Sequence, residues 1–143
     1  GAILANARES QLIPLKAALN KIGIIDQITN DIKGSFGDSS KKSIDNDIIQ
    51  GQKTILSIIS YQNANKAQKE ILQKTLGNAN ASKEDIDKVR EIFKATQAVE
   101  FANSYALTLK MEAQNLFQQI YPGLRKESEQ FFIQLIEYLM SSN

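Results

Sequence analysis

The feature that most constrains the fold is the spacing of apolar residues in the first part of the chain. Between residues 8 and 33 an apolar side chain recurs every three or four positions, at Leu12, Leu15, Leu19, Ile22, Ile25, Ile28 and Ile32. That interval is the repeat of one face of an α-helix. Pro14 falls within the stretch, so the helix is predicted either to begin near Pro14 or to bend there.

The region that follows alternates between polar loops and further helical patterns. Residues 34–46 are rich in Gly, Ser and Lys, which predicts a loop. A helical stretch is expected to open at Asp47. Another is expected to run over residues 66–76 and to stop at Gly77, because glycine tolerates the backbone conformation that ends helices.

The second half of the chain shows the same helical spacing. Ser82 is predicted to cap a helix that continues to Ile120, and a last helix is expected over residues 124–140. Only 2 Pro and 7 Gly interrupt a composition rich in helix-forming residues. The sequence therefore predicts an all-α fold, an antiparallel bundle of five or six helices in a single domain, 1–143.

Composition excludes several classes of function. Without Cys or His the chain can form no disulfide, no thiolate or imidazole metal site and no His-based triad, so any metal ligands must be oxygen atoms. The net charge of +1 supplies no basic excess for nucleic-acid binding. No apolar stretch is long enough to span a membrane. The lack of Cys fits a cytoplasmic location.

Candidate site residues gather between the end of the first predicted helix and the start of the next. Carboxylates, amides and lysines are the groups that a Mg²⁺-bridged diphosphate requires. They are Gln27, Asn30, Asp31, Asp38, Lys41, Lys42, Asp45, Asp47 and Lys53. By composition alone, a solvated helix end followed by a polar loop explains the same residues, and this alternative stays open.

Several motifs in this order resemble the trans-isoprenyl diphosphate synthases, also called polyprenyl synthetases. Residues 1–7 read GAILANA and residues 22–31 read IGIIDQITND, against the family patterns GAxLAGA and LGxAFQxxDDxxD. Residues 37–54 resemble the family's GD…GKxxGxDLxxGKxT. The resemblance covers the whole chain but only the C-terminal half of the family's all-α fold.

The resemblance implies a role for each matching residue. Three would contact an allylic diphosphate: Gln27, Lys42 and Lys53. Two would stand where the family has paired aspartates that bind Mg²⁺: Asn30 and Asp31. Asp38 and Asp47 match two further positions of the family pattern. The implied ligands are therefore Mg²⁺ and an allylic diphosphate.

The chain departs from the family pattern where charge matters. Asn30 and Gly34 replace two aspartates of the second Asp-rich motif, and Gln52 replaces a lysine. Mg²⁺ affinity is therefore expected to be weak, and restoring both carboxylates (Asn30→Asp, Gly34→Asp) is expected to tighten diphosphate binding. The family's first DDxxD motif has no counterpart in this sequence. We therefore expect the chain to be inactive alone.

Three functions are compatible with these observations. The first is a C-terminal part or subunit of a short-chain trans-prenyltransferase of isoprenoid biosynthesis, resembling geranylgeranyl or farnesyl diphosphate synthase. The second is a non-catalytic interaction or regulatory subunit, and the third an unrelated helical adaptor. Half of such a fold would expose an apolar face, so a protein partner is expected: the missing half, a catalytic subunit or a second copy. Candidates for that face are Phe101, Tyr105, Phe117, Phe131 and Phe132. For any one of these aromatic residues an ordinary core position is the more common explanation.

Overall fold

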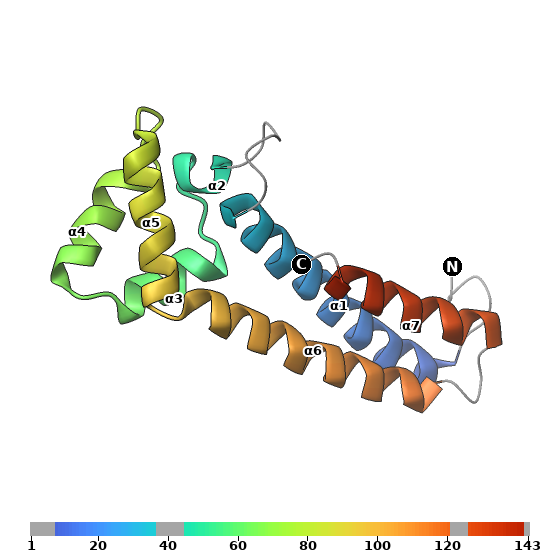
Figure 1. The fold of residues 1–143 in the computed structure, drawn as a ribbon. Helices are drawn as coiled ribbons and strands as arrows, with labels where there is room; N and C mark the ends of the chain where they lie inside the picture. The colour runs from blue at the N-terminus through green and yellow to red at the C-terminus, as the bar shows by residue number, and fades with distance from the viewer. Residues whose placement is uncertain (1–7, 37–44, 121–125, 142–143) are drawn as a thin grey trace. The chain divides into compact units, whose positions relative to one another are not determined.

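The computed structural model describes residues 8–36, 45–120 and 126–141, and these residues form helices joined by short turns. The helices are α1 (Glu9–Phe36), α2 (Asn46–Ile49), α3 (Ile55–Asn63), α4 (Lys66–Thr75), α5 (Lys83–Ala95), α6 (Ala98–Ile120) and α7 (Lys126–Ser141) (Figure 1). No strand occurs within these described ranges. The prediction of an all-α fold is confirmed.

The described residues form seven helices rather than five or six, because the chain turns at two points where the apolar pattern continues. The first point separates α2 from α3. Gly51 has a φ of +64°, and a Cβ atom placed on it would lie 2.9 Å from the Cα of Gly77. The Gly77 amide also donates to the Ile48 carbonyl at 2.9 Å. Two backbones therefore touch at a glycine pair, and a continuous helix from Asp47 could not make this contact.

The second unforeseen turn separates α5 from α6. Gln97 has a φ of 58°, which breaks the helix that the sequence predicted to continue from Ser82 to Ile120. Thr96 donates its hydroxyl to the Ile92 carbonyl at 2.7 Å and shares a hydrogen bond of 2.8 Å with the Ser60 hydroxyl on α3. These buried polar contacts stabilise the turn. Sequence spacing did not reveal it because Ile92, Phe93 and Ala98 keep the helical interval.

Helix ends that were predicted from capping residues are confirmed. The Ser82 hydroxyl accepts the Asp85 amide at 3.1 Å at the start of α5. Gly77 follows α4 with a φ of +80°, the left-handed conformation expected after a helix. The first helix, in contrast, extends past the predicted loop boundary to Phe36 and passes through Pro14. The ring of Phe36 packs against Phe93 of α5 with centroids 6.4 Å apart.

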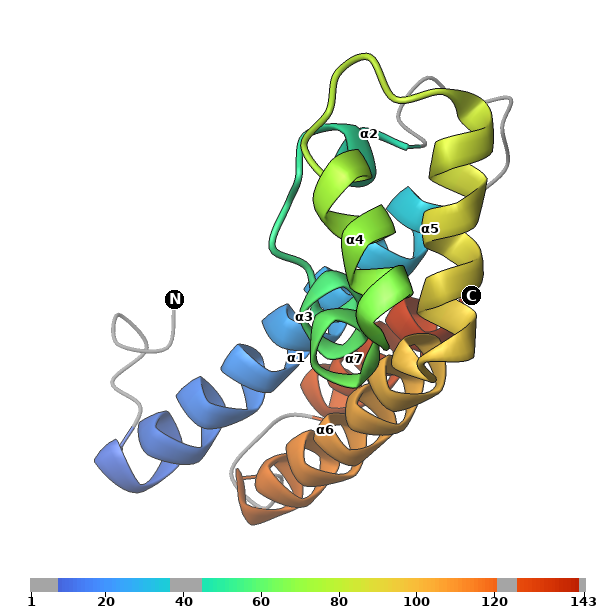
Figure 2. The same ribbon diagram turned by 90° about the vertical axis from the view of Figure 1, so that its left-hand side faces the viewer.

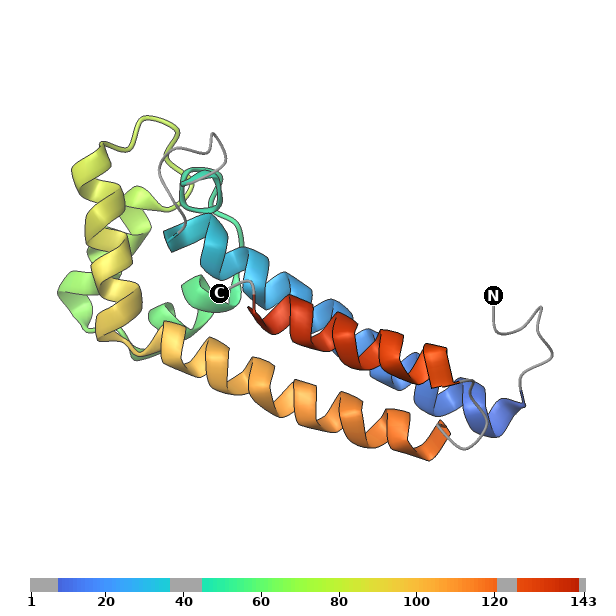
Figure 3. The same cartoon turned by 45° about the vertical axis from the view of Figure 1, so that its right-hand side comes forward.

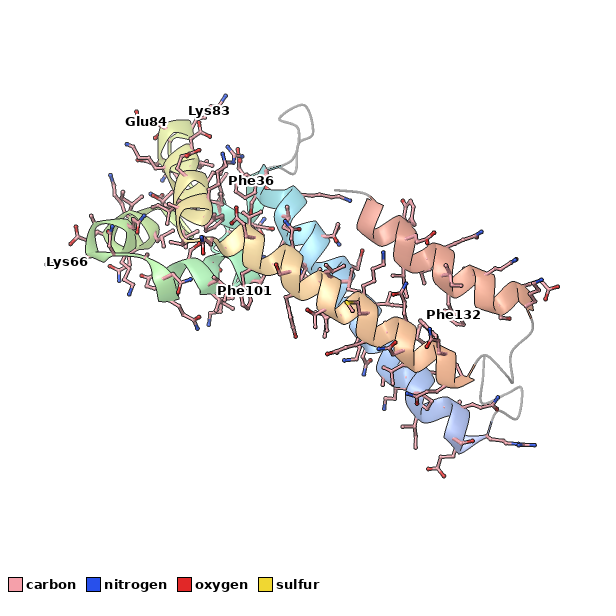
Figure 4. All side chains as sticks on the ribbon, turned by 60° about the horizontal axis from the view of Figure 1, so that its bottom comes forward. Phe36, Lys66, Lys83, Glu84, Phe101 and Phe132 are labelled. Atoms are coloured by element: carbon pink, nitrogen blue, oxygen red, sulfur yellow. The ribbon has the colours of Figure 1, made fainter. Side chains whose placement is uncertain are left out.

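The chain divides into two compact units, of which the first comprises residues 1–29 and 105–143. Its core forms where parts of α1, α6 and α7 pack together, around Ala18, Ile22, Ala113, Phe117, Ile120 and Ile136. The rings of Phe117 and Phe132 stack with centroids 4.4 Å apart. Figure 3 shows α7 running alongside α1, and Figure 4 shows Phe132 projecting from α7.

The second unit comprises residues 30–104. In it α3, α4 and α5 pack around buried apolar side chains, among them Leu56, Leu72, Ile86, Val89, Ile92 and Phe93 (Figure 2). The end of α1 and the short α2 complete this unit. It contains most of the residues that the sequence singled out for diphosphate chemistry.

The apolar side chains proposed for a partner face are not all exposed. Phe117 is fully buried in the core of the first unit, which excludes it from that face and confirms the alternative of an ordinary core aromatic for this residue. Its ring stacks on the half-buried Phe132. Phe101, Tyr105 and Phe131 are exposed, by 49%, 41% and 58% respectively. None of the helices in the part of the chain that the structure describes is both long and apolar enough to cross a membrane.

The hydroxyl pair between α3 and α5 is expected to contribute measurably to stability. Ser60→Ala removes one partner of the buried Ser60–Thr96 hydrogen bond. We predict that the free energy of unfolding, measured in urea, falls by about 1 kcal/mol, the usual net value of such a bond. Gln62→Ala, at an exposed position of the same helix, serves as the control. Equal stability of the Ser60→Ala and parent chains would contradict this assignment.

Candidate diphosphate site at the end of the first helix

The structure places the sequence-predicted site residues on three consecutive segments. Gln27, Asn30 and Asp31 lie on α1, Asp47 lies on α2, and Lys53 lies in the extended segment before α3. Three further predicted residues, Asp38, Lys41 and Lys42, fall outside the described residues.

Asp31 is the most constrained of these side chains. It is only 4% exposed, although it is a carboxylate. Its Oδ2 atom accepts the backbone N–H of Ile55 at 3.2 Å, in the first turn of α3. The unpaired amides at a helix N-terminus and the helix dipole both favour a negative charge at this point. The structure therefore gives Asp31 a helix-capping role that the sequence did not indicate.

Asn30 and Gln27 lie differently from Asp31. Both are exposed. Successive residues of an α-helix are rotated by about 100° around its axis, so Asn30 and Asp31 project in different directions. Asn30 instead shares a face with Gly34, one turn further along.

Gly34 marks the point where α2 approaches α1. A Cβ atom placed on Gly34 would lie 2.5 Å from Oδ2 of Asp47 and 3.2 Å from its Cγ. The Asp47 carboxylate thus occupies the space that any side chain at position 34 would need. Asp47 supplies a carboxylate at the position where the second Asp-rich motif lacks one.

Asp47 and Asp31 interact electrostatically. Partial burial raises the pKa of Asp47 above its ordinary value, and the negative charge of Asp31 raises it further. Two carboxylates held near each other in this way favour a bound proton or a bound cation. They form the acidic centre of the candidate site.

Lys53 places a positive charge close in sequence to Asp47. It is exposed and directly precedes Thr54, whose side chain accepts the Ser57 amide at 3.2 Å and so caps α3. The amide that Asp31 accepts belongs to Ile55, two residues after Lys53. A basic side chain and a helix N-terminus therefore follow the acidic pair, an arrangement suited to anionic oxygens.

Arg90 of α5 is a residue of this region that sequence reasoning missed. Its Nε atom donates to the Ser35 carbonyl at 2.6 Å, its Nη1 atom to Asp87 at 2.6 Å, and its Nη2 atom is paired with Asp45. No local pattern distinguishes it, because a polar residue between two buried positions is ordinary on a helix. Only the fold brings it to the end of α1.

Magnesium would find oxygen donors at this centre, but not a complete cage. Within the described residues no group of three or more carboxylates is arranged to hold a metal ion. Mg²⁺ commonly takes one or two protein carboxylates and completes its shell with water and substrate phosphates. Asp31 and Asp47, with the exposed amide of Asn30, fit that partial set.

A separate hollow lies in the first unit. It has a volume of about 310 Å³ and is lined by Met111, Gln114, Asn115, Gln118 and Ile133. Among the described residues, amide and apolar side chains line it.

Comparison with known proteins defines the family. The polyprenyl synthetase family model matches residues 1–93, about two thirds of the chain, which include every candidate site residue. The chain therefore belongs to the polyprenyl synthetase family. The particular proteins that it resembles are isoprenyl diphosphate synthases of archaea and bacteria.

Two curated relatives illustrate this similarity. A geranylgeranyl diphosphate synthase of Saccharolobus solfataricus is 38% identical over 96 residues, which are 66% of this chain and 29% of the relative. A short chain isoprenyl diphosphate synthase of Methanocaldococcus jannaschii is 34% identical over 104 residues, 71% of this chain and 31% of the relative. The chain thus matches less than a third of the length of either relative.

A solved structure shows the same fold. The geranylgeranyl pyrophosphate synthase of Corynebacterium glutamicum, complexed with isoprenyl diphosphate and magnesium, superposes with a TM-score of 0.89 at 22% identity. The match covers 100% of this chain and 41% of that protein. The chain therefore has the all-α fold of this protein.

The pKa of Asp47, which partial burial and the charge of Asp31 both raise, predicts a pH-dependent effect of substitution. A carboxyl whose folded pKa is raised stabilises the fold while it is protonated, and that contribution is lost as pH rises through the folded pKa. Asp47→Asn removes the unfavourable charge. We therefore predict a higher Tm for Asp47→Asn than for the parent chain at pH 7, with the difference vanishing near about pH 3, where aspartates become protonated.

Thermal denaturation followed by circular dichroism checks this prediction. Glu70→Gln, at an exposed position of α4, removes one negative charge elsewhere and is the control. An equal Tm for Asp47→Asn and the parent chain at pH 7 would show that the two carboxylates do not repel each other.

Proposed function

We propose that this chain supplies the allylic-diphosphate-binding part of a short-chain trans-prenyltransferase of isoprenoid biosynthesis, of the geranylgeranyl or farnesyl diphosphate synthase kind. The observation that carries the proposal is the acidic pair of Asp31 and Asp47 at the junction of α1 and α2. Family membership supports it, because the matched residues 1–93 contain this pair.

Mg²⁺ is the proposed cofactor, held by Asp31 and Asp47 with help from the Asn30 amide. Bound there, it would neutralise diphosphate oxygens and so make the diphosphate a better leaving group. The protein's own lysines would complete this neutralisation. We assign Lys53 and Lys42 to diphosphate oxygens, and Gln27 to a hydrogen bond with the same group. Asp38 remains a further motif position of the same site.

The reaction of this class breaks the allylic C–O bond and joins the resulting carbocation to a second isoprenyl unit. Positioning and charge stabilisation carry such chemistry, and they require anionic groups on both sides of the metal-bound diphosphate. This chain offers one partial acidic site, with Asn30 and Gly34 at two of the aspartate positions. We therefore propose that the chain alone binds diphosphate weakly and does not catalyse prenyl transfer.

A non-catalytic interaction or regulatory subunit is the second candidate. The observation that favours it is the engagement of Asp31, whose carboxylate already accepts the Ile55 amide and is almost fully buried. A carboxylate committed to a helix N-terminus is less available to a metal. Under this alternative the site would be a structural remnant, and binding of diphosphate would not depend on Mg²⁺.

A protein partner is part of either proposal. Large apolar side chains are exposed on the first unit, among them Ile13, Leu19, Leu107, Met111, Phe131 and Tyr138. Exposed apolar surface of this kind usually meets another protein surface. The solved relative has more than half of its length outside the matched region, so we propose that an equivalent prenyltransferase region covers these residues. Because the chain contains no Cys, we keep the cytoplasm as its proposed location.

Calorimetric titration of geranyl diphosphate tests the proposal. We predict binding with Mg²⁺ present and none with EDTA. Asp31→Asn retains an acceptor for the Ile55 amide but loses charge, and it should weaken Mg²⁺-dependent binding at least about tenfold, or about 1.4 kcal/mol. Glu84→Gln at the exposed start of α5 is the matched control. Equal binding in Mg²⁺ and EDTA would reject metal-assisted binding and favour the non-catalytic alternative.

Restoring the two motif carboxylates should tighten binding to different extents at the two positions. Asn30→Asp adds an exposed negative charge beside the acidic pair and should tighten Mg²⁺-dependent binding of geranyl diphosphate. Gly34→Asp must first displace the Asp47 carboxylate, which lies 2.5 Å from the new Cβ. We predict that it improves binding less than Asn30→Asp does in the same titration. An equal or larger gain from Gly34→Asp would contradict the placement of Asp47.

Prenyl transfer by the chain alone is a separate test. With radiolabelled isopentenyl diphosphate, an allylic diphosphate and Mg²⁺, we predict no product above the level of an enzyme-free control. Accumulation of labelled prenyl diphosphate would show that the chain is catalytically sufficient.

A further inference from the structure

The guanidinium group of Arg90 joins three separate segments of the second unit. Its Nε atom donates to the carbonyl of Ser35 near the end of α1, at 2.6 Å. Its Nη2 atom is paired with the Asp45 carboxylate just before α2, and its Nη1 atom binds Asp87 one turn back on α5. Side-chain exposure is 18% for Arg90 and 27% for Asp45, so solvent only partly screens this pair.

Asp45 is held in an unusual backbone conformation. Its φ of 78° lies in the left-handed region, which residues other than glycine adopt at a cost, although aspartate tolerates it better than most. In the family pattern GKxxGxD, the second glycine stands at this position. The backbone amide of Asp45 donates to the Gly34 carbonyl at 3.1 Å. Backbone and side chain of Asp45 are thus fixed by two separate contacts, one to α1 and one to α5.

The contacts of Arg90 and of the Asp45 amide involve residues on both sides of the segment 37–44. Ser35 and Gly34 precede residues 37–44, and Asp45 follows them. Arg90 therefore ties the point where the chain leaves α1 to the point where it enters α2. The aspartate that reaches Gly34, Asp47, lies only two residues beyond the tied Asp45.

We propose that Arg90 is a positioning residue, which with Asp45 sets the place of Asp47 against the end of α1 and so preserves the acidic pair. This inference deepens the proposed function and rests on it for its consequence in diphosphate binding. The tie itself stands on the geometry of Arg90 alone. A guanidinium is suited to the task, because its planar fork can hold a carbonyl and a carboxylate at the same time, which an ammonium group cannot do in the same geometry.

The variants separate this role from general stability. Arg90→Lys keeps the charge and loses the fork. Asp45→Asn keeps tolerance of the left-handed conformation and loses the ion pair. Asp87→Asn removes only the partner on α5, which does not touch α1 or α2. Ser60→Ala lowers the stability of the same unit through a distant hydrogen bond and controls for unfolding.

Amide hydrogen exchange measures the tie directly. The Asp45 amide, which donates to the Gly34 carbonyl, should exchange about tenfold faster in Arg90→Lys and in Asp45→Asn than in the parent chain. A tenfold increase is expected if each substitution lowers the equilibrium constant for closing this hydrogen bond about tenfold. Asp87→Asn should leave it unchanged. Ser60→Ala sets the acceleration that loss of stability alone produces. Exchange in Arg90→Lys no faster than in Ser60→Ala would overturn the tie.

Calorimetry with geranyl diphosphate and Mg²⁺ measures the consequence. Arg90→Lys and Asp45→Asn should each weaken binding by about tenfold, whereas Asp87→Asn and Ser60→Ala should bind as the parent chain does. One contrary outcome is that Arg90→Lys and Asp45→Asn bind geranyl diphosphate as tightly as the parent chain does, while the Asp45 amide exchanges faster in both. In that case Arg90 has only a structural role, and the positioning role is refuted. If the parent chain itself shows no Mg²⁺-dependent binding, the proposed function and the positioning role fall together, and the exchange data still decide the tie.

Discussion

A buried carboxylate needs a partner, and the way Asp31 finds one organises the surrounding unit. Its burial would be costly without a hydrogen bond or a cation. The first turn of α3 provides the bond, through the Ile55 amide, and the helix dipole adds a favourable field. This contact connects the end of α1 to the start of α3. The Asp31 carboxylate thus has a structural role in the free chain, and it is also the proposed metal ligand when Mg²⁺ is bound. These two roles compete for the same carboxylate.

The neighbouring contacts follow from that arrangement. With α1 and α3 connected through Asp31, the short α2 crosses against Gly34, where the absence of a side chain leaves space for the Asp47 carboxylate. Partial burial raises the pKa of Asp47, and the negative charge of Asp31 raises it further. Close to this approach, Arg90 binds the Ser35 carbonyl and the Asp45 carboxylate. Under our proposal Asp31 and Asp47 supply a partial acidic site although two motif positions lack a carboxylate.

Sequence spacing predicted the helical class, because the apolar intervals of α1 and the caps at Ser82 and Gly77 are local signals. The breaks at Gly51 and Gln97 were missed for a physical reason: the apolar interval continues across both, and the turns depend on contacts with Gly77 and Ser60 that lie far away in the sequence. The motif resemblance identified Asp31 and Asp47, but it did not predict the electrostatic interaction between them. Their mutual approach, and the role of Arg90, depend on how helices pack. The burial of Phe117 agrees with the interpretation of each such aromatic as a core residue, but helical spacing alone could not show which of the five would be buried.

We propose that the C-terminal end of α1 and the start of α2 together form one cation-binding centre. Paramagnetic Mn²⁺, which accepts the same oxygen ligands as Mg²⁺, can be titrated with inorganic diphosphate into ¹⁵N-labelled protein. Our account predicts that the amide signals of residues 30–34 and 45–48 broaden first and together, and that excess Mg²⁺ restores them. Broadening that begins at exposed carboxylates such as Glu84, or that spreads evenly over the chain, would contradict it.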